Sequence, residues 1–397
     1  MSIGADANVG VMGAGAMGAG IAQVAAVSGH AVILADENAE AVDRARDAHA
    51  RALARDVEKG RLTAEAAASA KARIRYLPGI SANHLGAMGE CGVVVEAIHE
   101  DLDAKRALFT MLDGIVTADC ILATNTSSLS VAAIASACLA KERVVGIHFF
   151  NPAPVMPLVE IVPALTTSAE TVHAAVALVE RWGKLSVVAS DTPGFIVNRI
   201  ARPFYGESLR VLEEGIADCA TIDWAMREIG GFRMGPFELM DLIGNDVNYA
   251  VTYSVFRSMF YDPRYRPTLT QRRLVEAGLL GRKAGRGYYD YRDGAPAATA
   301  ATEDRALGQR VVDRVLAMLI NEAVDALYLR VASAADIERA IVKGVNYPKG
   351  LLRWGDEIGA AKVLARLEAL QDEYGDDRYR PSVLLRNVVR AKGRLLA

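Results

Sequence analysis

A glycine-rich loop between a predicted strand and a predicted helix constrains the fold of this chain more than any other feature. Near its start the chain reads NVGVMGAGAMGAGIAQVAAVSGHAVILAD, where a short β-branched run leads into Gly13-x-Gly15-x-x-Gly18 and a helix of small residues. In a dinucleotide-binding fold the first glycine permits a tight turn, the second lets a pyrophosphate approach the backbone, and the third lets the helix pack on the strand. The helix N-terminus then presents N–H groups to the phosphates.

The residue that ends the next apolar run indicates which dinucleotide is bound. This second run, residues 31–35, ends at Asp36. A carboxylate at that point accepts hydrogen bonds from a ribose diol and repels a 2′-phosphate, so the pattern favours NAD over NADP. A GxGxxG is weak evidence by itself in a chain with 34 glycines. Its position between a strand and a helix is what supports the prediction.

Further strand-like runs alternate with helical segments through the first 190 residues. The apolar runs are residues 74–77, 92–98, 120–123, 143–149, 158–162 and 186–189. Helical periodicity between several of these runs predicts a doubly wound, largely parallel sheet, and hence an α/β domain over residues 1–190. Ligands bind beyond the carboxyl ends of the strands in such sheets. The polar candidates at those ends are Asp36, Glu96, Glu100, residues 125–128 and His148.

Two ionisable residues interrupt apolar runs that otherwise resemble core segments. His148 lies in residues 146–150, and Glu160 lies in the next run, beyond a turn rich in proline. A lone histidine in an apolar strand is often an ordinary core residue, and a lone glutamate can face solvent from an edge strand. A hairpin-like return would bring the two together, and a buried carboxylate needs such a partner. Paired in this way, the imidazole would be a general base with a fixed tautomer and a stabilised cation.

Composition argues against several classes of function. The 397 residues carry a net charge of −3, which gives no general attraction to nucleic acid or to an anionic membrane. The longest apolar runs fall well short of the about 20 residues that a membrane span needs. The first residues, MSIGADANV, lack the features of a secretory signal. Four cysteines without metal-like spacing predict buried thiols, so we expect a cytoplasmic protein without a metal site.

Six segments together resemble the L-3-hydroxyacyl-CoA dehydrogenases. They are, in order, GVMGAGAMGAGIAQ, ATNTSSL, HFFNPAPVMPLVEIV, DTPGFIVNRI, MGPFELMDLIG and GRKAGRGYYDY, and the resemblance extends from about residue 7 to residue 292. It implies a Rossmann domain followed by an all-α domain. The implied reaction is NAD-dependent oxidation of a (3S)-3-hydroxyacyl-CoA to the 3-oxoacyl-CoA, as in fatty acid metabolism and β-oxidation, with hydride passing to NAD.

The resemblance also implies roles for individual residues at the reacting end of the substrate. His148 matches the catalytic histidine of the family, and Glu160 matches its partner carboxylate. Ser127 matches a residue that hydrogen-bonds the reacting oxygen, and Asn198 matches one that holds the acyl-CoA carbonyl region. His148 would then accept the hydroxyl proton as hydride leaves C3, and no metal is required.

For the two ligands, NAD and an acyl-CoA, the resemblance and the charge pattern imply further contacts. The implied cofactor residues are Gly13, Gly15, Met17, Gly18 and Asp36, together with Glu100, Lys105 and Asn151 near the nicotinamide end. Phosphates of CoA need basic partners, and a basic stretch follows Asp36. Its residues Arg55, Lys59 and Arg61 are candidates, although a solvated helix face explains them equally well.

The second half of the chain has helical periodicity and repeats itself. Residues 206–244 align without gaps on residues 321–359, and ten of the 39 positions are identical. The shared ending Gly–x5–Asp–x–Ile–Gly is the strongest part of the repeat. We therefore expect an all-α C-terminal domain in two tandem copies, joined by a small, polar linker. The expected bounds are 191–293 for the first copy, 294–309 for the linker and 310–397 for the second copy.

The second copy lacks the PFEL segment and follows no Rossmann unit of its own, so we expect it to carry no chemistry. Single-copy members of the family dimerise through this helical domain. The resemblance therefore leaves two arrangements open, a homodimer and a chain whose second copy covers the first.

Three further questions stay open at this point. Arg233 stands where the family often has proline, and it could favour an acidic acyl tail or be an ordinary surface residue. The substrate could be a free hydroxy acid or sugar acid, as in dehydrogenases of the L-gulonate type. The chain could also be a non-catalytic NAD-binding protein, as some crystallin relatives of the family are.

Overall fold

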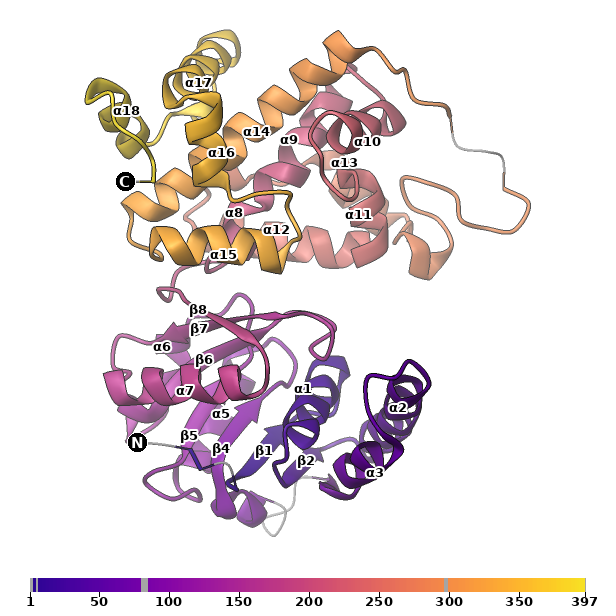
Figure 1. The fold of residues 1–397 in the computed structure, drawn as a ribbon, viewed down its shortest axis with the longest axis vertical. Coiled ribbons are helices and arrows are strands. Elements are labelled where there is room, and N and C mark those ends of the chain that lie inside the picture. The colour runs from indigo at the N-terminus through magenta and orange to yellow at the C-terminus, as the bar shows by residue number, and fades with distance from the viewer. Residues whose placement is uncertain (1–2, 5, 80–84, 296–298, 397) are drawn as a thin grey trace. The chain divides into compact units, whose positions relative to one another are not determined.

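The chain folds into two compact units that divide between Thr192 and Pro193. The computed structural model describes residues 3–4, 6–79, 85–295 and 299–396. Unit 1 (residues up to 192) is a β-sheet with its helices, and unit 2 (residues from 193) is helical (Figure 1). The boundary falls two residues beyond the end of the predicted nucleotide-binding domain.

Unit 1 is built on an eight-stranded sheet in the order β3-β2-β1-β4-β5-β6-β7-β8. Strands β1 to β6 are parallel, β7 pairs antiparallel with β6, and β8 pairs parallel with β7. The strands are Asn8–Met12, Val32–Asp36, Ile74–Pro78, Cys91–Glu96, Ile121–Thr124, Val144–Phe149, Leu158–Pro163 and Leu185–Val188. Chain order reverses between β1 and β4, which puts the switch point of the sheet at the ends of these strands. The predicted doubly wound, largely parallel α/β fold is confirmed.

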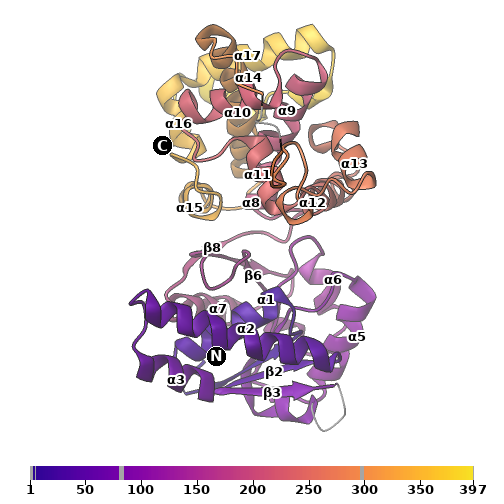
Figure 2. The ribbon, with the colours of Figure 1, turned by 90° about the vertical axis from the view of Figure 1, so that its right-hand side faces the viewer.

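Helices cover the sheet of unit 1, so its central strands are buried (Figure 2). One apolar core joins the sheet to α1, α2, α3 and α7, while α5 and α6 pack on strands β5 and β6. Burial on both faces explains why these strands are continuous apolar runs that the sequence reveals. The helices are α1 (Ala16–Val27), α2 (Ala39–Glu58), α3 (Ala64–Ala72), α5 (Leu102–Asp113), α6 (Val131–Ala135) and α7 (Ala169–Arg181).

Unit 2 is a set of helices, described here as an N-terminal half and a C-terminal half. The first half holds α8 (Val197–Ile200), α9 (Arg202–Glu213), α10 (Cys219–Glu228), α11 (Pro236–Ile243), α12 (Asn245–Ser258) and α13 (Leu269–Glu276). The second holds α14 (Arg305–Tyr328), α15 (Ala334–Gly344), α16 (Leu351–Ile358), α17 (Ala360–Tyr374) and α18 (Val383–Arg390). Pro203, near the start of α9, separates α8 from α9, because proline lacks the N–H that a helix interior needs. Met318 occupies the corresponding position inside the unbroken α14.

The predicted linker, residues 294–309, is too long at its C-terminal end. Helix α14 begins at Arg305, because the side chain of Asp304 accepts hydrogen bonds from the N–H groups of Ala306 and Leu307. The stretch before the helix is rich in small residues, so the sequence contains no clear signal of where the helix starts. Residues 296–298 of the predicted linker lie outside the described residues.

The two halves of unit 2 meet through reciprocal contacts of buried residues. Arg199 Nε, of the first half, donates to Glu322 Oε1 at 2.7 Å, and Arg314 Nε, of the second half, donates to Glu207 Oε1 at 2.9 Å. A tyrosine hydroxyl from the same half as each arginine donates to the same carboxylate, from Tyr265 to Glu322 and from Tyr379 to Glu207. Such exchange of equivalent contacts is what a two-fold interface produces. Among the described residues, no helix combines the length and apolarity required to cross a membrane.

Candidate active site

The glycine loop joins β1 to α1 and leaves room beside its backbone. Gly13 has a φ of +105°, and a Cβ there would collide with the carbonyl group of Ala97. A Cβ at Gly18 would collide with the carbonyl oxygen of Gly13, so the helix packs closely on the loop. A Cβ at Gly15 would meet nothing within 4 Å. Gly15 is the N-cap of α1, and no side chain caps this helix end, so the open space lies beside N–H groups that suit a pyrophosphate.

Asp36 ties the end of β2 to the glycine loop. Its Oδ2 accepts a hydrogen bond from the N–H of Ala14 at 2.6 Å, and its Oδ1 accepts one from the N–H of Asn38 at 2.8 Å. Met17, which follows the loop in the first turn of α1, is half-buried. The loop, Met17 and Asp36 are therefore contiguous, and together they fit a dinucleotide.

His148 and Glu160 face each other across the antiparallel pair of β6 and β7. The two residues are register partners, and His148 Nδ1 lies 2.7 Å from Glu160 Oε2. His148 is 5% exposed and Glu160 is 0% exposed. An ionised carboxylate can only accept hydrogen bonds, so the proton of the neutral imidazole is on Nδ1 and the lone pair is on Nε2. The pairing thus assigns the basic nitrogen of the ring.

Asn125 holds the end of β6 beside the histidine, a contact that the sequence did not reveal. Its side-chain oxygen accepts a hydrogen bond from the N–H of Phe149 at 2.8 Å, and its own N–H donates to the carbonyl oxygen of Glu96. Asn125 therefore links strands β4 and β6 at the residue that follows His148. The only sequence signal was a polar side chain directly after a buried strand.

The loop that carries Ser127 closes around the carboxylate of Glu100. Oε1 of Glu100 accepts hydrogen bonds from the N–H groups of Ser127 and Ser128 at 3.0 and 3.2 Å, and from the hydroxyl of Thr126 at 2.6 Å. Burial by itself would raise the pKa of Glu100, but the charge of Lys105 and these hydrogen bonds lower that pKa overall. The loop is consequently organised around an anion, and the half-buried Ser127 lies next to it.

Lys105 lies in a buried ion cluster at the ends of β4 and β5. Its ammonium lies 2.6 Å from Glu96 Oε1 and 3.2 Å from Glu100 Oε2, and its side chain is 1% exposed. The remaining carboxylate oxygen of Glu96 accepts a hydrogen bond from the hydroxyl of Thr124 at 2.7 Å. A buried charge is tolerated when it is paired in this way. The cluster fixes Glu100, which in turn orders the Ser127 loop.

The segment between β6 and β7 contains Asn151, which is exposed. A lysine that directly precedes β8 holds this segment in place. Lys184 Nζ donates to the carbonyl oxygens of Ala153, Pro154 and Met156 at 2.6, 3.2 and 2.8 Å. Nothing in the sequence pointed to this lysine. It stabilises the connection between the strands that carry His148 and Glu160.

The remaining predicted site residues lie at the end of α2 and on α8. Arg55, Lys59 and Arg61 are exposed at the end of α2, and Arg61 also pairs with Asp56 at 3.3 Å. Asn198 is half-buried on α8, and thus belongs to unit 2. The described parts of the chain contain no group of three or more His, Cys, Asp or Glu side chains arranged to hold a metal ion.

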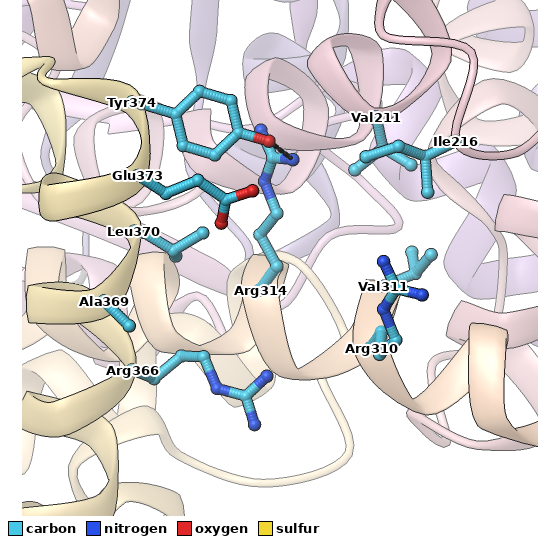
Figure 3. Close-up of a pocket in the computed structure, with 10 residues that line it drawn as sticks. All are labelled: Val211, Ile216, Arg310, Val311, Arg314, Arg366, Ala369, Leu370, Glu373 and Tyr374. Carbon is cyan, nitrogen blue, oxygen red and sulfur yellow. Dashed lines mark hydrogen bonds between the residues drawn. The ribbon is translucent and has the colours of Figure 1, made fainter.

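A cavity of about 350 Å³ in unit 2 contains none of the predicted site residues (Figure 3). It lies along the seam between the two halves, between α9, α14 and α17. Arg314 in its wall is held by Glu207 and Glu214, and Arg366 is paired with Asp313 at 2.6 Å. We therefore regard the cavity as a packing feature of that seam.

Two family models match the chain. The model described as "3-hydroxyacyl-CoA dehydrogenase, NAD binding domain" matches residues 8–192, and the model described as "3-hydroxyacyl-CoA dehydrogenase, C-terminal domain" matches residues 194–291 and 311–395. Together the matches cover most of the chain.

Individual proteins match as well. The chain is 41% identical to the 3-hydroxyadipyl-CoA dehydrogenase of Escherichia coli (strain K12), over 95% of this chain and 96% of that one. It is 40% identical to the 3-hydroxybutyryl-CoA dehydrogenase of Bradyrhizobium diazoefficiens, over 73% of this chain and 97% of the relative. Among solved structures, a 3-hydroxybutyryl-CoA dehydrogenase from Escherichia coli K12 matches with a TM-score of 0.90 at 39% identity, covering 97% of this chain and 98% of that one.

Proposed function

The chain belongs to the 3-hydroxyacyl-CoA dehydrogenase family, and from this premise we propose which of its residues perform the reaction. The protein is an oxidoreductase that acts on a CH–OH group and oxidises 3-hydroxyacyl-CoA with NAD. The predicted family, enzyme class and cofactor are confirmed. The roles of individual residues, the tail of the substrate and the assembly are the proposal.

We propose that His148 is the general base. Its Nε2 would take the proton of the 3-hydroxyl group, while Glu160 stabilises the imidazolium that forms. Bound NAD supplies the acceptor for the hydride that leaves C3. The observation that supports this assignment is the buried 2.7 Å contact between His148 Nδ1 and Glu160 Oε2, which leaves the lone pair on Nε2.

Ser127 and Asn198 would position the substrate. The hydroxyl of Ser127 would donate to the reacting oxygen, and the backbone N–H of Ser127 is already held by Glu100 at 3.0 Å. The side-chain amide of Asn198 would hold the thioester carbonyl region. Neither residue transfers a proton in this scheme, so both contribute alignment of the substrate rather than acid–base chemistry.

We propose the cofactor-binding residues from the open backbone of the glycine loop, which can accommodate a pyrophosphate. The pyrophosphate would lie beside Gly13, Gly15 and Gly18 at the N-terminus of α1, next to Met17, and the ribose diol would donate to Asp36. Glu100, held by Lys105, and Asn151 would lie toward the nicotinamide end. Arg55, Lys59 and Arg61 remain candidates for the phosphates of CoA, because all three are exposed and basic.

For the acyl chain, we propose a tail that ends in a carboxylate. The relative that matches 95% of this chain, including both helical stretches, is named for 3-hydroxyadipyl-CoA. The 3-hydroxybutyryl-CoA dehydrogenase of Bradyrhizobium diazoefficiens matches only 73% of this chain. Two relatives match nearly the whole chain, one named for 3-hydroxyadipyl-CoA and one for 3-hydroxybutyryl-CoA, and the first of these names supports the dicarboxylic tail that we propose.

We also propose that the helical domain is duplicated and that the second copy covers the first within one chain. Supporting this are the two stretches matched by one family model and the reciprocal ion pairs of Arg199 with Glu322 and of Arg314 with Glu207. The homodimer considered above stays a prediction, and analytical ultracentrifugation of the full chain tests it.

A cytoplasmic location is part of the proposal. All four cysteines are free, and burial raises the pKa of each thiol to about 12. Thiols of this kind are unreactive and suit a reducing compartment. Fractionation of cells that express the protein at its natural level tests the location.

One assay tests the proposed function against its two rivals. NADH formation is measured with (3S)-3-hydroxyacyl-CoA substrates and with the corresponding free acids. Turnover of the thioesters alone supports the proposal. Turnover of free acids alone would indicate a dehydrogenase of the L-gulonate type, and NAD binding without any turnover would indicate a non-catalytic protein.

A further inference from the structure

One arginine in unit 2 is buried without a carboxylate beside it. Arg202, the first residue of α9, is 7% exposed. Its Nε donates to the carbonyl oxygen of Asn198 at 2.8 Å, and its Nη1 donates to the hydroxyl of Thr252 at 3.2 Å. Among the described residues no acidic side chain forms a salt bridge with it. By contrast, the buried Arg199 and Arg314 each pair with carboxylates.

With these contacts, the positive charge of Arg202 has no negative partner among the described residues, and several of its N–H donors are not used in the hydrogen bonds given above. A guanidinium has five N–H donors, and the contacts with Asn198 and Thr252 use two of them. A buried cation is costly unless an anion compensates it, and burial accordingly lowers the pKa of Arg202. The ring of Tyr205, 5.0 Å below the guanidinium, offsets part of this cost through a cation–π contact. Within the described ranges of the chain, no carboxylate forms an ion pair that would offset the rest.

A second unpartnered donor belongs to the same part of unit 2. Tyr347 is 5% exposed, and its hydroxyl has no hydrogen-bond partner among the described residues. Its ring packs against Phe204 at 5.6 Å and against Phe232 at 4.9 Å. Phe204, which packs against this ring, lies two residues from Arg202 in the first turn of α9, so the two donors belong to one region of unit 2. Two buried donors with apolar walls around them are suited to a carboxylate.

The position of Arg202 relates these donors to the substrate. Arg202 follows Asn198 by four residues, and the two are neighbours at the junction of α8 and α9, because Arg202 Nε donates to the backbone carbonyl oxygen of Asn198. Asn198 is the residue proposed to hold the thioester carbonyl region. A short acyl chain that starts at Asn198 would therefore end near Arg202.

We propose that Arg202, assisted by the hydroxyl of Tyr347, binds a carboxylate at the far end of the acyl chain. This inference rests on the proposed function and assigns the residues that select the tail. A tail that ends in a carboxylate accepts charge-assisted hydrogen bonds from the guanidinium. A tail that ends in methyl leaves both donors unpaired, and sites of this kind discriminate strongly against such analogues. Tyr347 lies in the second half of unit 2, so the duplicated copy contributes to specificity.

The test compares two six-carbon (3S)-3-hydroxyacyl-CoA substrates, one with a terminal carboxylate and one with a terminal methyl. The purified full-length enzyme should prefer the carboxylate in kcat/KM by about 100-fold. Arg202→Met should reduce this ratio to near one, mainly by raising KM for the carboxylate substrate. Arg202→Lys, which keeps a charge but loses the planar fork, should retain part of the preference. Tyr347→Phe should reduce the ratio by about 3- to 10-fold.

Arg233 provides the matched control, because it is an exposed arginine of the same half of unit 2. Arg233→Gln should leave the ratio unchanged; a loss of preference in this variant alone would transfer the role to Arg233 and overturn the proposal. Thermal unfolding of each variant checks the fold. If Arg202→Met does not fold, Tyr347→Phe decides the question, since it removes only a hydroxyl without a hydrogen-bond partner in the described part of the chain.

The outcomes separate this inference from the proposed function. Equal turnover of both substrates by the unmodified enzyme, or an equal loss for both in Arg202→Met, would overturn the carboxylate site and leave the dehydrogenase activity standing. Absence of turnover with either thioester would instead overturn the function on which the inference rests.

Discussion

Nδ1 of His148 lies 2.7 Å from Oε2 of Glu160, and the two residues are partners in the register of an antiparallel strand pair. The contact is buried on both sides, so water does not compete for it. A strand pair is also rigid, which keeps the imidazole at one orientation. The geometry therefore supplies a base whose tautomer and direction are set before the substrate arrives.

Replacement of the histidine tests the base directly. His148→Gln should lower kcat by at least ~100-fold, because a general base contributes about that much or more. NAD affinity should be nearly unchanged, since the glycine loop and Asp36 are untouched. Initial rates of NADH formation and a fluorescence titration with NAD measure the two quantities. Unaltered turnover would remove His148 from the mechanism.

Replacement of the glutamate tests the pairing. An amide at position 160 can donate to Nδ1, so Glu160→Gln would favour the tautomer with its proton on Nε2 and would no longer stabilise the imidazolium. We expect kcat to fall by about 100-fold or more. Rates across pH for the variant and the parent enzyme provide the measurement. A variant with the parental rate at every pH would show that the carboxylate has only a structural role.

The open space beside Gly15 can be filled without strain. Gly15 has a φ of −67°, which any residue adopts, and a Cβ there meets nothing within 4 Å. Gly15→Val should therefore leave the unfolding temperature nearly unchanged while weakening NAD binding at least ~10-fold, because the side chain occupies the space beside the phosphate-binding N–H groups. Gly86→Val is the matched control, since Gly86 also has a negative φ and open space around its Cβ. Equal NAD affinity in both variants would place the pyrophosphate elsewhere.

The buried His49 should make unit 1 sensitive to mild acid. Its Nε2 lies 2.7 Å from the carbonyl oxygen of Ala19, its Nδ1 lies 2.8 Å from the hydroxyl of Tyr76, and burial lowers its pKa. Because the unfolded chain binds this proton more readily, the stability that neutral His49 contributes is present above pH about 6.5 and is lost as the pH falls through that value.

Urea unfolding at pH 7.5 and pH 5.5 measures the effect of His49. His49→Gln should reduce the difference between the two pH values, whereas His173→Gln, at an exposed histidine of α7, should not. An unchanged difference in the His49 variant would assign the acid sensitivity to other groups.

Removal of one carboxylate at the seam of unit 2 should be costly. The two arginines that contact Glu322 lower its pKa overall, although burial by itself would raise that pKa. Glu322→Gln would leave Arg199 and Arg264 short of a counter-charge, and loss of one partner from a buried pair costs about 3–5 kcal/mol. Glu276→Gln breaks the exposed pair with Arg272 and should cost less than about 1 kcal/mol. Denaturant unfolding measures the loss in the free energy of unfolding for both variants. Similar losses would show that the buried pairs of Glu322 stabilise unit 2 no more than an exposed pair does.

The sequence by itself determined the elements whose signal is local. The glycines at 13, 15 and 18 form a pattern within six consecutive positions, directly after an apolar run, so it can be recognised without knowledge of the fold. The strands of the sheet were visible because burial on both faces produces continuous apolar runs. The repeat expected in unit 2 rests on ten identical positions out of 39 and on shared terminal glycines, and the duplication stays a prediction. The chemistry expected of His148 and Glu160 followed from the cost of burying ionisable groups.

Only the tertiary structure decided how these elements meet. The register of β6 and β7 sets the 2.7 Å contact of His148 with Glu160; a shift by one residue would turn one of the two side chains to the other face. Lys184 and Asn125 make side-chain contacts with backbone groups that lie 24 or more residues away, and no local pattern encodes them. That Arg202 forms no salt bridge with any described carboxylate likewise depends on the packing of unit 2. Contacts between distant residues depend on the folded path of the chain, which sequence periodicity does not specify.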